Sequence, residues 1–199
     1  MSTKRDLEFL YEMGCLRFIP RAWVQFFGPD FQNLAEHHLR VIWIALVLAR
    51  MERKGNIEKI MKMALVHDVP ESRTGDVDYV SRMYTKRDES MGMRDIVKDT
   101  ILEKEMLELW YEYEKKKSVE SRIVKDADTL DVDLEVQEQA MKGHKHVKVW
   151  MAEREMFVPT RLYTASAKKL WKAIIKSCPY DWHRNARNRI NYGDWKTEK

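Results

Sequence analysis

Hydrophobic residues recur at spacings of three and four along almost the whole chain, and stretches of strict alternation are hard to find. A period near 3.6 is typical of helices that bury one face. Only 7 glycines and 5 prolines interrupt the pattern, which therefore predicts an all-α fold. The expected helices span residues 4–14, 33–53, 56–67, 94–116, 119–142, 145–156 and 161–177, with an irregular stretch at 15–32.

The segment 56–67 is expected to form a central helix. Asn56 follows Gly55 and is a suitable N-cap for it. Its apolar residues form one stripe at helical spacing, made up of Ile57, Ile60, Met61, Ala64 and Leu65. The following segment, 69–87, contains proline, glycine and several Asp and Ser residues, so we expect a loop there. Loops beside buried helices often carry function.

The chain has the size and composition of one domain. It contains 199 residues, 44% of them hydrophobic, which is enough apolar surface for one continuous core. No internal repeat, low-complexity tract or change in composition marks a second domain. We expect a single helical domain over residues 1–199, with a core at about 5–177 and a C-terminal extension at 178–199 whose role the sequence does not define.

The charge of the chain is nearly balanced. Its 36 Lys and Arg residues against 32 Asp and Glu residues give a formal net charge of +4. DNA-binding domains usually carry a clustered basic excess, so no nucleic-acid partner is expected. The longest apolar run, Val41–Ala49, is far shorter than the ~20 residues of a membrane-spanning helix, and it predicts a buried core helix instead.

The cysteines and the N-terminus favour a cytoplasmic location. Cys15 and Cys178 lie far apart and form neither a CxxC pair nor the dense pattern of a disulfide-bonded secreted domain. Residues 1–6 run directly into charged side chains, without the apolar stretch of a signal peptide.

The helix predicted at 56–67 ends in His67 and is followed directly by Asp68. Asp68 lies three and four residues after Leu65 and Ala64, so it should continue the buried face of that helix. Burying an unpaired carboxylate costs several kcal/mol, on the order of the penalties for unpaired buried charges, so a cation or strong donors must face it. A divalent metal ion is one answer.

Two further clusters of ionisable residues lie on predicted core helices. Glu36, His37 and His38 open the helix that contains the run 41–49, and Asp126 and Asp128 lie on the helix at 119–142. The apolar stripe of the second helix comprises Ile123, Val124, Ala127, Leu130 and Leu134. Imidazole nitrogens together with carboxylate oxygens suit first-row ions such as Mn, Fe, Co, Ni or Zn. The absence of clustered cysteines argues against a structural zinc site.

Each of these residues has a simpler explanation when it is taken alone. A single His or Asp is more often a helix cap, a solvated residue or a hydrogen-bonded one than a metal ligand. Their combination is harder to explain in this way. An adjacent His67-Asp68 pair is preceded by a histidine 30 positions upstream, His37, and Asp128 follows 61 positions after His67.

With these residues the sequence resembles the HD-domain metallophosphohydrolase superfamily, whose ligand set follows the order H, HD, D. The segments 67–76 and 125–128 contain the patterns HD-x-x-E-x-x-x-G-D and K-x-A-D, which resemble those of the 5′-deoxynucleotidase branch. The bare HD dipeptide carries no weight, whereas the two longer patterns at this distance are specific. The resemblance covers about residues 5–160.

The resemblance implies one divalent metal ion, whether Co, Mn, Zn, Ni or Fe, in a site with the following ligands: His37, His67, Asp68 and Asp128. It implies that Glu71 is the catalytic acidic residue and that Asp76 lies near the sugar and the metal-bound water. Without it, Glu71 would be interpreted as a surface ion-pair residue and Asp76 as a turn residue.

An upstream segment resembles the part of the family that contacts phosphate and sugar. Pro20-Arg21-Ala22-Trp23 offers Arg21 for the phosphate and Trp23 for the nucleoside. Arg17 lies close enough to compete for the role of Arg21. Trp23 could equally belong to a hydrophobic lid together with neighbouring aromatic residues, Phe18, Phe26 and Phe27.

The remaining histidines are expected to serve other purposes. His38 is the main rival of His37, although we expect it to support the site rather than to bind the metal. Glu36 either orients an imidazole or complements the positive end of its helix. His144 and His146 are expected to be solvated surface residues.

The function expected from the resemblance is hydrolysis of 2′-deoxynucleoside 5′-monophosphates to deoxynucleoside and phosphate, by a homodimer. One alternative is another HD hydrolase, such as a nucleotide triphosphohydrolase or a phosphodiesterase. A second is a metal- and nucleotide-binding module without turnover, against which Glu71 and Asp76 argue, because such a module needs no proton-transfer carboxylates.

Overall fold

The computed structural model of the protein describes residues 3–184, and within that range the chain is helical with no β-strand. The helices are α1 (Thr3–Gly14), η1 (Cys15–Phe18), α2 (Val24–Phe27), α3 (Leu34–Glu52), α4 (Ile57–Val66), α5 (Glu71–Thr74), η2 (Ser81–Met83), α6 (Glu89–Val97), α7 (Glu103–Lys115), α8 (Val119–Met141), α9 (Val147–Arg161), α10 (Ala165–Ile174) and α11 (Asp181–Arg184), where η denotes a 3₁₀ helix. The predicted all-α fold is confirmed.

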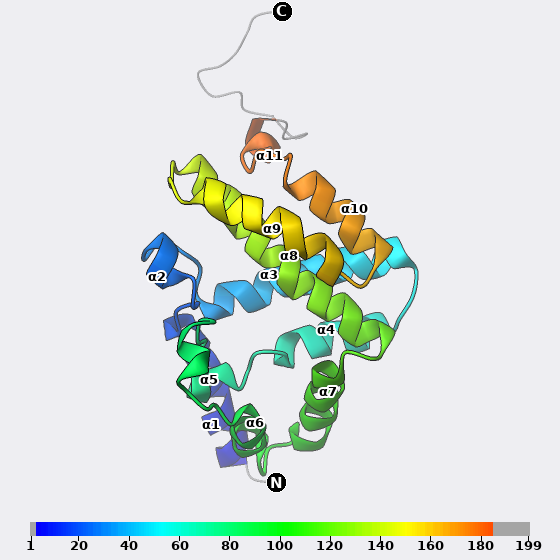
Figure 1. Ribbon diagram of the computed structural model, residues 1–199. Coiled ribbons are helices and arrows are strands. Elements are labelled where there is room, and N and C mark those ends of the chain that lie inside the picture. Colours follow the sequence, from blue (N-terminus) through cyan, green and yellow to red (C-terminus); the bar gives the residue numbers. More distant parts are fainter. Residues whose placement is uncertain (1–2, 185–199) are drawn as a thin grey trace, which may run out of the picture.

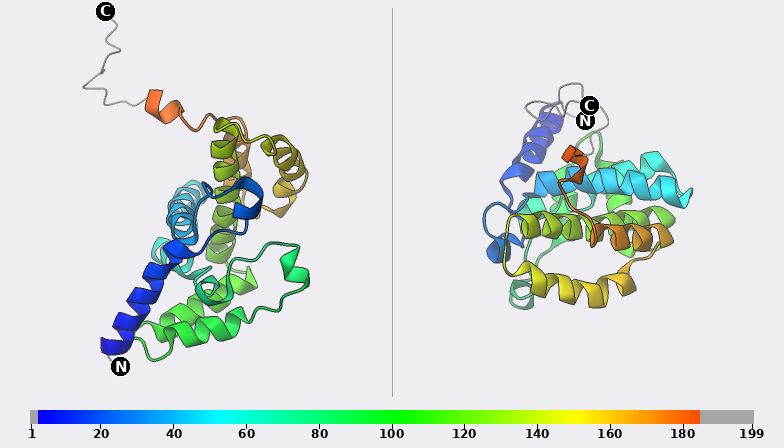
Figure 2. Two further views of the ribbon diagram at one scale, coloured as in Figure 1. Left: turned by 90° about the vertical axis from the view of Figure 1, so that its left-hand side faces the viewer. Right: turned by 90° about the horizontal axis from the view of Figure 1, so that it is seen from above.

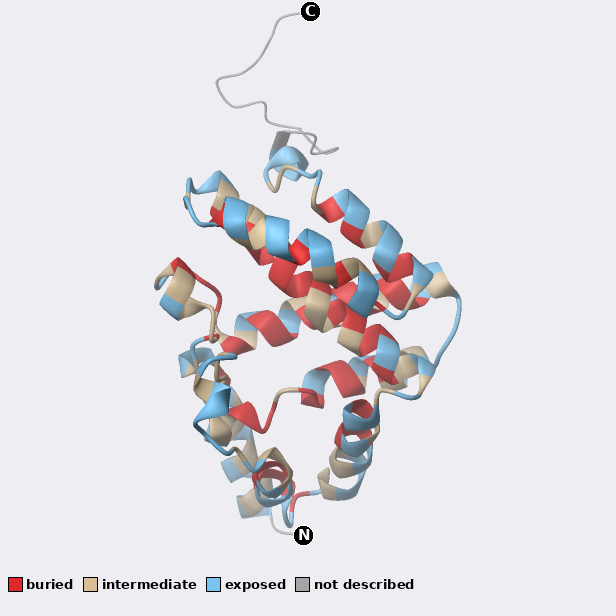
Figure 3. Cartoon of the chain, in the orientation of Figure 1, coloured by how far each residue is buried: buried red, intermediate tan, exposed pale blue. Residues whose placement is uncertain are grey.

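The longest helix, α8, forms the centre of the bundle. It packs against α3, α4, α7, α9 and α10 (Figure 1). Seen from above, α8 lies between α3 and α9 (Figure 2). Figure 3 shows that buried positions concentrate on α3, α4 and α8, whereas α1 has no buried residue. The helices that bury most are therefore those on which the sequence places the ionisable clusters.

The two helices that precede the His-Asp pair are capped as their sequences predict. Asn33 and Glu36 form a capping box at the start of α3, in which each side chain accepts a hydrogen bond from the other residue's backbone N–H. Glu36 therefore stabilises the helix end and does not orient an imidazole. At the start of α4 the Asn56 side chain accepts from the Lys59 N–H, which confirms the predicted cap.

The predicted helix at 94–116 is wrong, because the structure contains two helices there. α6 ends at Val97 and α7 begins at Glu103. Between them Asp99 adopts a left-handed backbone conformation with φ of 61°, and its N–H donates to the Glu103 side chain. The Thr100 hydroxyl donates to the Val97 carbonyl. These local side-chain hydrogen bonds end one helix and begin the next without glycine or proline.

Two other expectations need correction at the level of single residues. In α4, Met61 and Leu65 are exposed, while Met63 and Val66 are buried, so the buried stripe is rotated from the predicted one. In α3, the run 41–49 is buried on one face only, because Trp43 and Val47 are 63% and 47% exposed.

The irregular segments contain short helices. The stretch predicted as irregular at 15–32 includes η1 and α2, and the loop predicted at 69–87 includes α5 and η2. α9 and α10 lie close to the helices expected at 145–156 and 161–177. Of the predicted extension at 178–199, residues 178–184 are described and contain α11, and the rest lies outside the described residues. Among the described residues, no helix is long and apolar enough to cross a membrane.

Candidate active site

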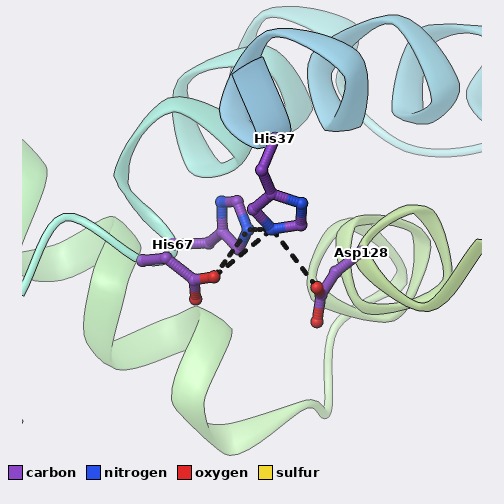
Figure 4. Close-up of side chains that lie close together, drawn as sticks. His37, His67 and Asp128 are labelled. Atoms are coloured by element: carbon purple, nitrogen blue, oxygen red, sulfur yellow. Dashed lines mark hydrogen bonds and ion pairs between the residues drawn. The ribbon is translucent and has the colours of Figure 1, made fainter. Parts of the chain in front are cut away.

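Four side chains predicted as metal ligands converge at the centre of the bundle. His37 lies on the first turn of α3, His67 caps the end of α4, Asp68 follows it, and Asp128 lies on α8. Each offers one ligand atom, and these atoms all lie within 4.8 Å of one another. Figure 4 shows His37, His67 and Asp128 pointing toward one another. The predicted grouping is thus found in the structure.

The spacing between these atoms is that of donors around one small cation. His37 Nε2 lies 3.4 Å from Asp68 Oδ2, 3.4 Å from Asp128 Oδ1 and 3.3 Å from His67 Nε2. His67 Nε2 lies 3.4 Å from Asp68 Oδ2. Bonds of about 2.0–2.2 Å to a metal ion place neighbouring donors about 3.0–3.5 Å apart. The residues present therefore fit a divalent metal ion.

Hydrogen bonds to the Nδ1 atoms orient both imidazoles. His67 Nδ1 donates to the Ala64 carbonyl oxygen at 2.8 Å, so its Nε2 is the atom with a free lone pair. His37 Nδ1 lies 2.6 Å from Asp131 Oδ2, and both side chains are fully buried. Because the Asp131 carboxylate holds Nδ1 of His37, the other ring nitrogen, Nε2, points toward Asp68 and Asp128. The two imidazoles thus aim their Nε2 atoms at one point, as metal ligands do.

The ionisation of the two carboxylate ligands also favours a cation. Burial opposes ionisation of Asp68, yet His67 and His37 hold its pKa well below the usual range. Burial likewise opposes ionisation of Asp128, whose pKa is held low by Lys125 and His37. Lys125 Nζ lies 2.7 Å from Asp128 Oδ2. Both ligands are therefore anionic at neutral pH.

Glu71 lies beside this cluster at the start of α5 and is buried. Burial, together with the Asp68 and Asp76 carboxylates, raises the pKa of Glu71 to about 9. Its Oε1 accepts from Arg87 Nη1 at 3.3 Å, and its Oε2 lies 3.6 Å from Arg21 Nη1. A carboxyl group that holds a proton at neutral pH next to a cation site has the character of a general acid.

Arg21 joins the upstream segment to the acidic cluster. Its side chain is 7% exposed, and its Nη1 lies 2.9 Å from Asp76 Oδ2 and 3.4 Å from Asp68 Oδ2. Asp76 Oδ2 also accepts from the Ala22 N–H at 3.1 Å. Arg17 is exposed and its guanidinium lies over the Phe18 ring. Of the two candidate arginines, the structure therefore brings Arg21 to the cluster and leaves Arg17 outside.

A pocket of about 390 Å³ opens beside Asp68 and Asp128. Its aromatic side consists of Trp23, Phe26 and Tyr79, where the rings of Phe26 and Tyr79 are stacked with centroids 6.1 Å apart. Trp23 also packs edge-on against Trp150 with centroids 4.9 Å apart. Trp23 is thus both a pocket residue and part of an aromatic cluster, and its contact with a nucleoside stays a prediction.

The structure adds three residues that sequence analysis missed. Asp131 holds His37, Arg87 contacts Glu71, and Lys125 pairs with Asp128. The spacing of Asp128 and Asp131, three residues apart on one helix, could have revealed the first, and the K-x-A-D pattern the third. Nothing in the sequence identifies Arg87, because it lies in a loop whose path depends on the fold.

The other histidines differ partly from expectation. His38 is buried, its ring lies 4.8 Å from the His67 ring, and its Nε2 has no hydrogen-bond partner among the described residues. It does not belong to the group of possible metal ligands. His146 is exposed as predicted, but His144 is partly buried against Phe27, with ring centroids 5.0 Å apart. The expectation of a solvated His144 is wrong, because the aromatic cluster around Phe27 extends to it.

Comparison with known proteins agrees with this arrangement. The family model described as "HD domain" matches residues 13–171. The 5′-deoxynucleotidase HDDC2 of Danio rerio is 34% identical over 138 residues, which are 66% of this chain and 68% of that protein. The PH0347 protein from Pyrococcus horikoshii OT3 has a TM-score of 0.67 and 25% identity, and the match covers 85% of this chain and 98% of that one.

A further solved structure shares the fold at greater distance. It is the HD phosphohydrolase DatZ of cyanophage S-2L, bound to dA and one catalytic Zn²⁺ ion, with a TM-score of 0.50 and 20% identity over 84% of this chain and 96% of that one. The matched family model, the curated relative and the grouping of His, His-Asp and Asp on three core helices agree. The chain belongs to the HD-domain family, and within that family to its 5′-deoxynucleotidase branch.

Proposed function

We propose that this protein is a metal-dependent phosphomonoesterase that hydrolyses 2′-deoxynucleoside 5′-monophosphates to the deoxynucleoside and inorganic phosphate. The observation that carries the proposal is the group His37, His67, Asp68 and Asp128, which opens onto a pocket with an arginine on one side and aromatic rings on another. Likeness to the 5′-deoxynucleotidase of Danio rerio supports the same activity.

The four ligands would hold one divalent metal ion. When bound, such an ion lowers the pKa of a coordinated water and neutralises charge on the phosphate. Nitrogen and oxygen donors accommodate Co, Mn, Zn, Ni or Fe, and affinity alone does not identify the working ion. The zinc ion named for the cyanophage relative supports a divalent metal in this fold.

In this proposal the other residues orient the substrate and move protons. Arg21 binds phosphate oxygens and is itself positioned by Asp76. The water oxygen attacks phosphorus, and the bond between phosphorus and O5′ breaks. Glu71, whose pKa is raised by burial, donates its proton from a carboxyl oxygen to the departing O5′, and one proton of the attacking water then returns to the Glu71 carboxylate. The nucleoside lies against Trp23 and its neighbouring rings.

The test is phosphate release from chelator-treated protein to which each divalent ion is added back. The expected result is turnover of dAMP, with little release from dATP or from a phosphodiester. If dATP or the phosphodiester were hydrolysed faster than dAMP, the proposed reaction would be rejected in favour of another hydrolysis of the HD family. Nucleotide binding without phosphate release would indicate a binding module.

His67→Ala and Asp68→Ala should remove both metal and activity, and normal activity in either variant would overturn the ligand assignment.

We further propose a cytoplasmic homodimer. Both cysteines are free, which suits a reducing compartment. On α3, Leu39, Trp43 and Val47 form an exposed apolar stripe at intervals of four residues, with exposed fractions of 60%, 63% and 47%. Such a stripe can pack against its own copy across a two-fold axis. Light scattering should give a dimer that Trp43→Glu converts to a monomer, and a wild-type monomer at micromolar concentration would overturn the proposal.

A further inference from the structure

Behind the metal ligand His37 lies a carboxylate that the proposed reaction does not use. Asp131 is fully buried on α8, one turn after Asp128, and its Oδ2 accepts from His37 Nδ1 at 2.6 Å. The same oxygen accepts from Gln32 Nε2 at 2.5 Å. Its other oxygen accepts from Arg40 Nε at 2.6 Å. Together these three hydrogen bonds hold the Asp131 carboxylate in one orientation.

Arg40 is in turn held by three further oxygens. Its Nη1 donates to Glu138 Oε1 at 2.8 Å, and its Nη2 donates to Glu135 Oε2 at 2.5 Å and to Gln32 Oε1 at 2.9 Å. Arg40 lies on α3 one turn after His37, whereas Asp131, Glu135 and Glu138 lie on α8. The network therefore ties together the two helices that carry His37 and Asp128.

We infer that Asp131 is a positioning residue for the metal site, and that Arg40 fixes Asp131 in this role. A carboxylate that accepts from Nδ1 selects the tautomer with a free lone pair on Nε2, prevents rotation of the ring, and makes Nε2 a stronger donor to the metal. Removing such partners typically costs about 10–100-fold in metal affinity or activity. The inference rests on the proposed metal site and extends it beyond the four ligands.

The chain provides a matched control on the same helix. Asp133 is also fully buried, and it accepts hydrogen bonds from Arg154, including one from Nη2 at 2.9 Å. It contacts none of the four ligands. Asp131→Asn and Asp133→Asn therefore remove the same charge, at similar depth and opposite an arginine in both cases. Only the first variant disturbs the hydrogen bond to His37.

The experiment measures binding of Co²⁺ to the full-length chain, by competition with a chromophoric chelator and by the visible absorption of the bound ion. We expect Asp131→Asn to weaken Co²⁺ binding by about 10–100-fold and to change the absorption spectrum, because the geometry of His37 relaxes. Asp133→Asn should lower the melting temperature while its affinity and spectrum stay as in the wild type. Arg40→Met should weaken binding less than Asp131→Asn does.

The possible outcomes are distinct. Wild-type affinity and spectrum in a folded Asp131→Asn protein would overturn the inference. Equal losses of affinity in the Asp131 and Asp133 variants would also overturn it, because general destabilisation would then explain both. If the wild-type protein bound no Co²⁺ at all, the proposed metal site would be rejected, together with the proposed function and the inference that rests on it. A wild-type protein that binds one ion and hydrolyses dAMP keeps the two questions separate.

Discussion

Arg21 Nη1 lies 2.9 Å from Asp76 Oδ2, in a pair whose side chains are 7% and 6% exposed. Because Asp68 and Glu71 also lie within 3.6 Å of this guanidinium nitrogen, Arg21 is the cation that balances the acidic side of the pocket. In the proposed reaction it is the group that binds the phosphate.

The first prediction concerns Arg21. Arg21→Lys should lower kcat/KM for dAMP by about 10²-fold or more, because a point charge cannot replace the forked guanidinium contact with phosphate. Steady-state phosphate release measures this loss. The control is Arg17→Lys, which changes an exposed arginine four residues upstream and should leave kcat/KM unchanged. Equal losses in both variants would contradict the assignment.

The second prediction concerns the catalytic role of Glu71. Glu71→Gln should reduce kcat by about 10²–10⁴-fold while the metal content stays at one ion per chain, because the amide cannot deliver a proton. Metal analysis and turnover are measured on the same sample. Glu89→Gln serves as the control, since Glu89 also lines the pocket and pairs with Arg87. If Glu89→Gln were the more damaging change, Glu71 would not be the general acid.

The third prediction uses the pKa of Glu71, which burial raises from 4.5 to about 9. Between these values the folded, metal-free protein keeps a proton on Glu71 that the unfolded chain has lost. Stability therefore falls as pH rises through this window. Glu71→Gln copies the protonated form, so it should flatten the profile and stabilise the metal-free protein at pH of about 8. Urea unfolding of chelator-treated samples across the window checks this, and parallel profiles for both proteins would refute it.

The fourth prediction concerns proton release on metal binding. Burial and Arg21 lower the pKa of His37, but hydrogen bonds with Asp128, Asp131 and Asp68 outweigh them and raise it to about 10. The metal-free site therefore holds a proton on His37 at neutral pH, and the metal ion must displace it. We expect release of about one proton per ion. Calorimetry in two buffers of different ionisation enthalpy measures it, and identical binding enthalpies would exclude the exchange.

The fifth prediction separates the two interpretations of Trp23. If Trp23 contacts the nucleoside, Trp23→Ala should raise KM for dAMP by about ten-fold, the scale of one base-aromatic stack, and leave hydrolysis of a small alkyl phosphate unchanged. Trp150→Ala removes the neighbouring ring, which packs on Trp23 but does not line the pocket. Matching effects of both variants on both substrates would show that Trp23 acts only as part of a lid.

The chain's periodicity predicts most of its helices because each helix buries a stripe in one core. It fails where local side-chain hydrogen bonds compete with the helix. The break between α6 and α7 depends on Asp99 in a left-handed conformation and on Thr100, and neither residue is a strong breaker in sequence. The rotated stripe of α4 has a different cause. Met61 and Leu65 are as apolar as the residues that are buried, so hydrophobicity alone does not show which face of α4 packs against the core.

The candidate site likewise contains residues that the sequence predicts and residues that only the structure identifies. His37, His67, Asp68 and Asp128 follow from the family pattern, and the structure groups them. The residues that surround them depend on tertiary contacts. Asp131 reaches His37 across 94 positions of sequence, and the loop that carries Arg87 turns back onto Glu71. Periodicity places a residue on a face of its helix, but it does not identify the partner across the interface.

The predicted metal ligands and the proposed nucleotide contacts lie in different kinds of segment. His37, His67 and Asp128 belong to helices packed in the core, whereas Arg21, Trp23, Asp76 and Tyr79 lie outside the long helices. Segments of this kind accept insertions and exchanges that a packed helix does not tolerate. Directed evolution of substrate preference can therefore be confined to residues 19–33 and 75–88, provided that Arg21, Asp76 and Arg87, which contact the acidic cluster, are kept.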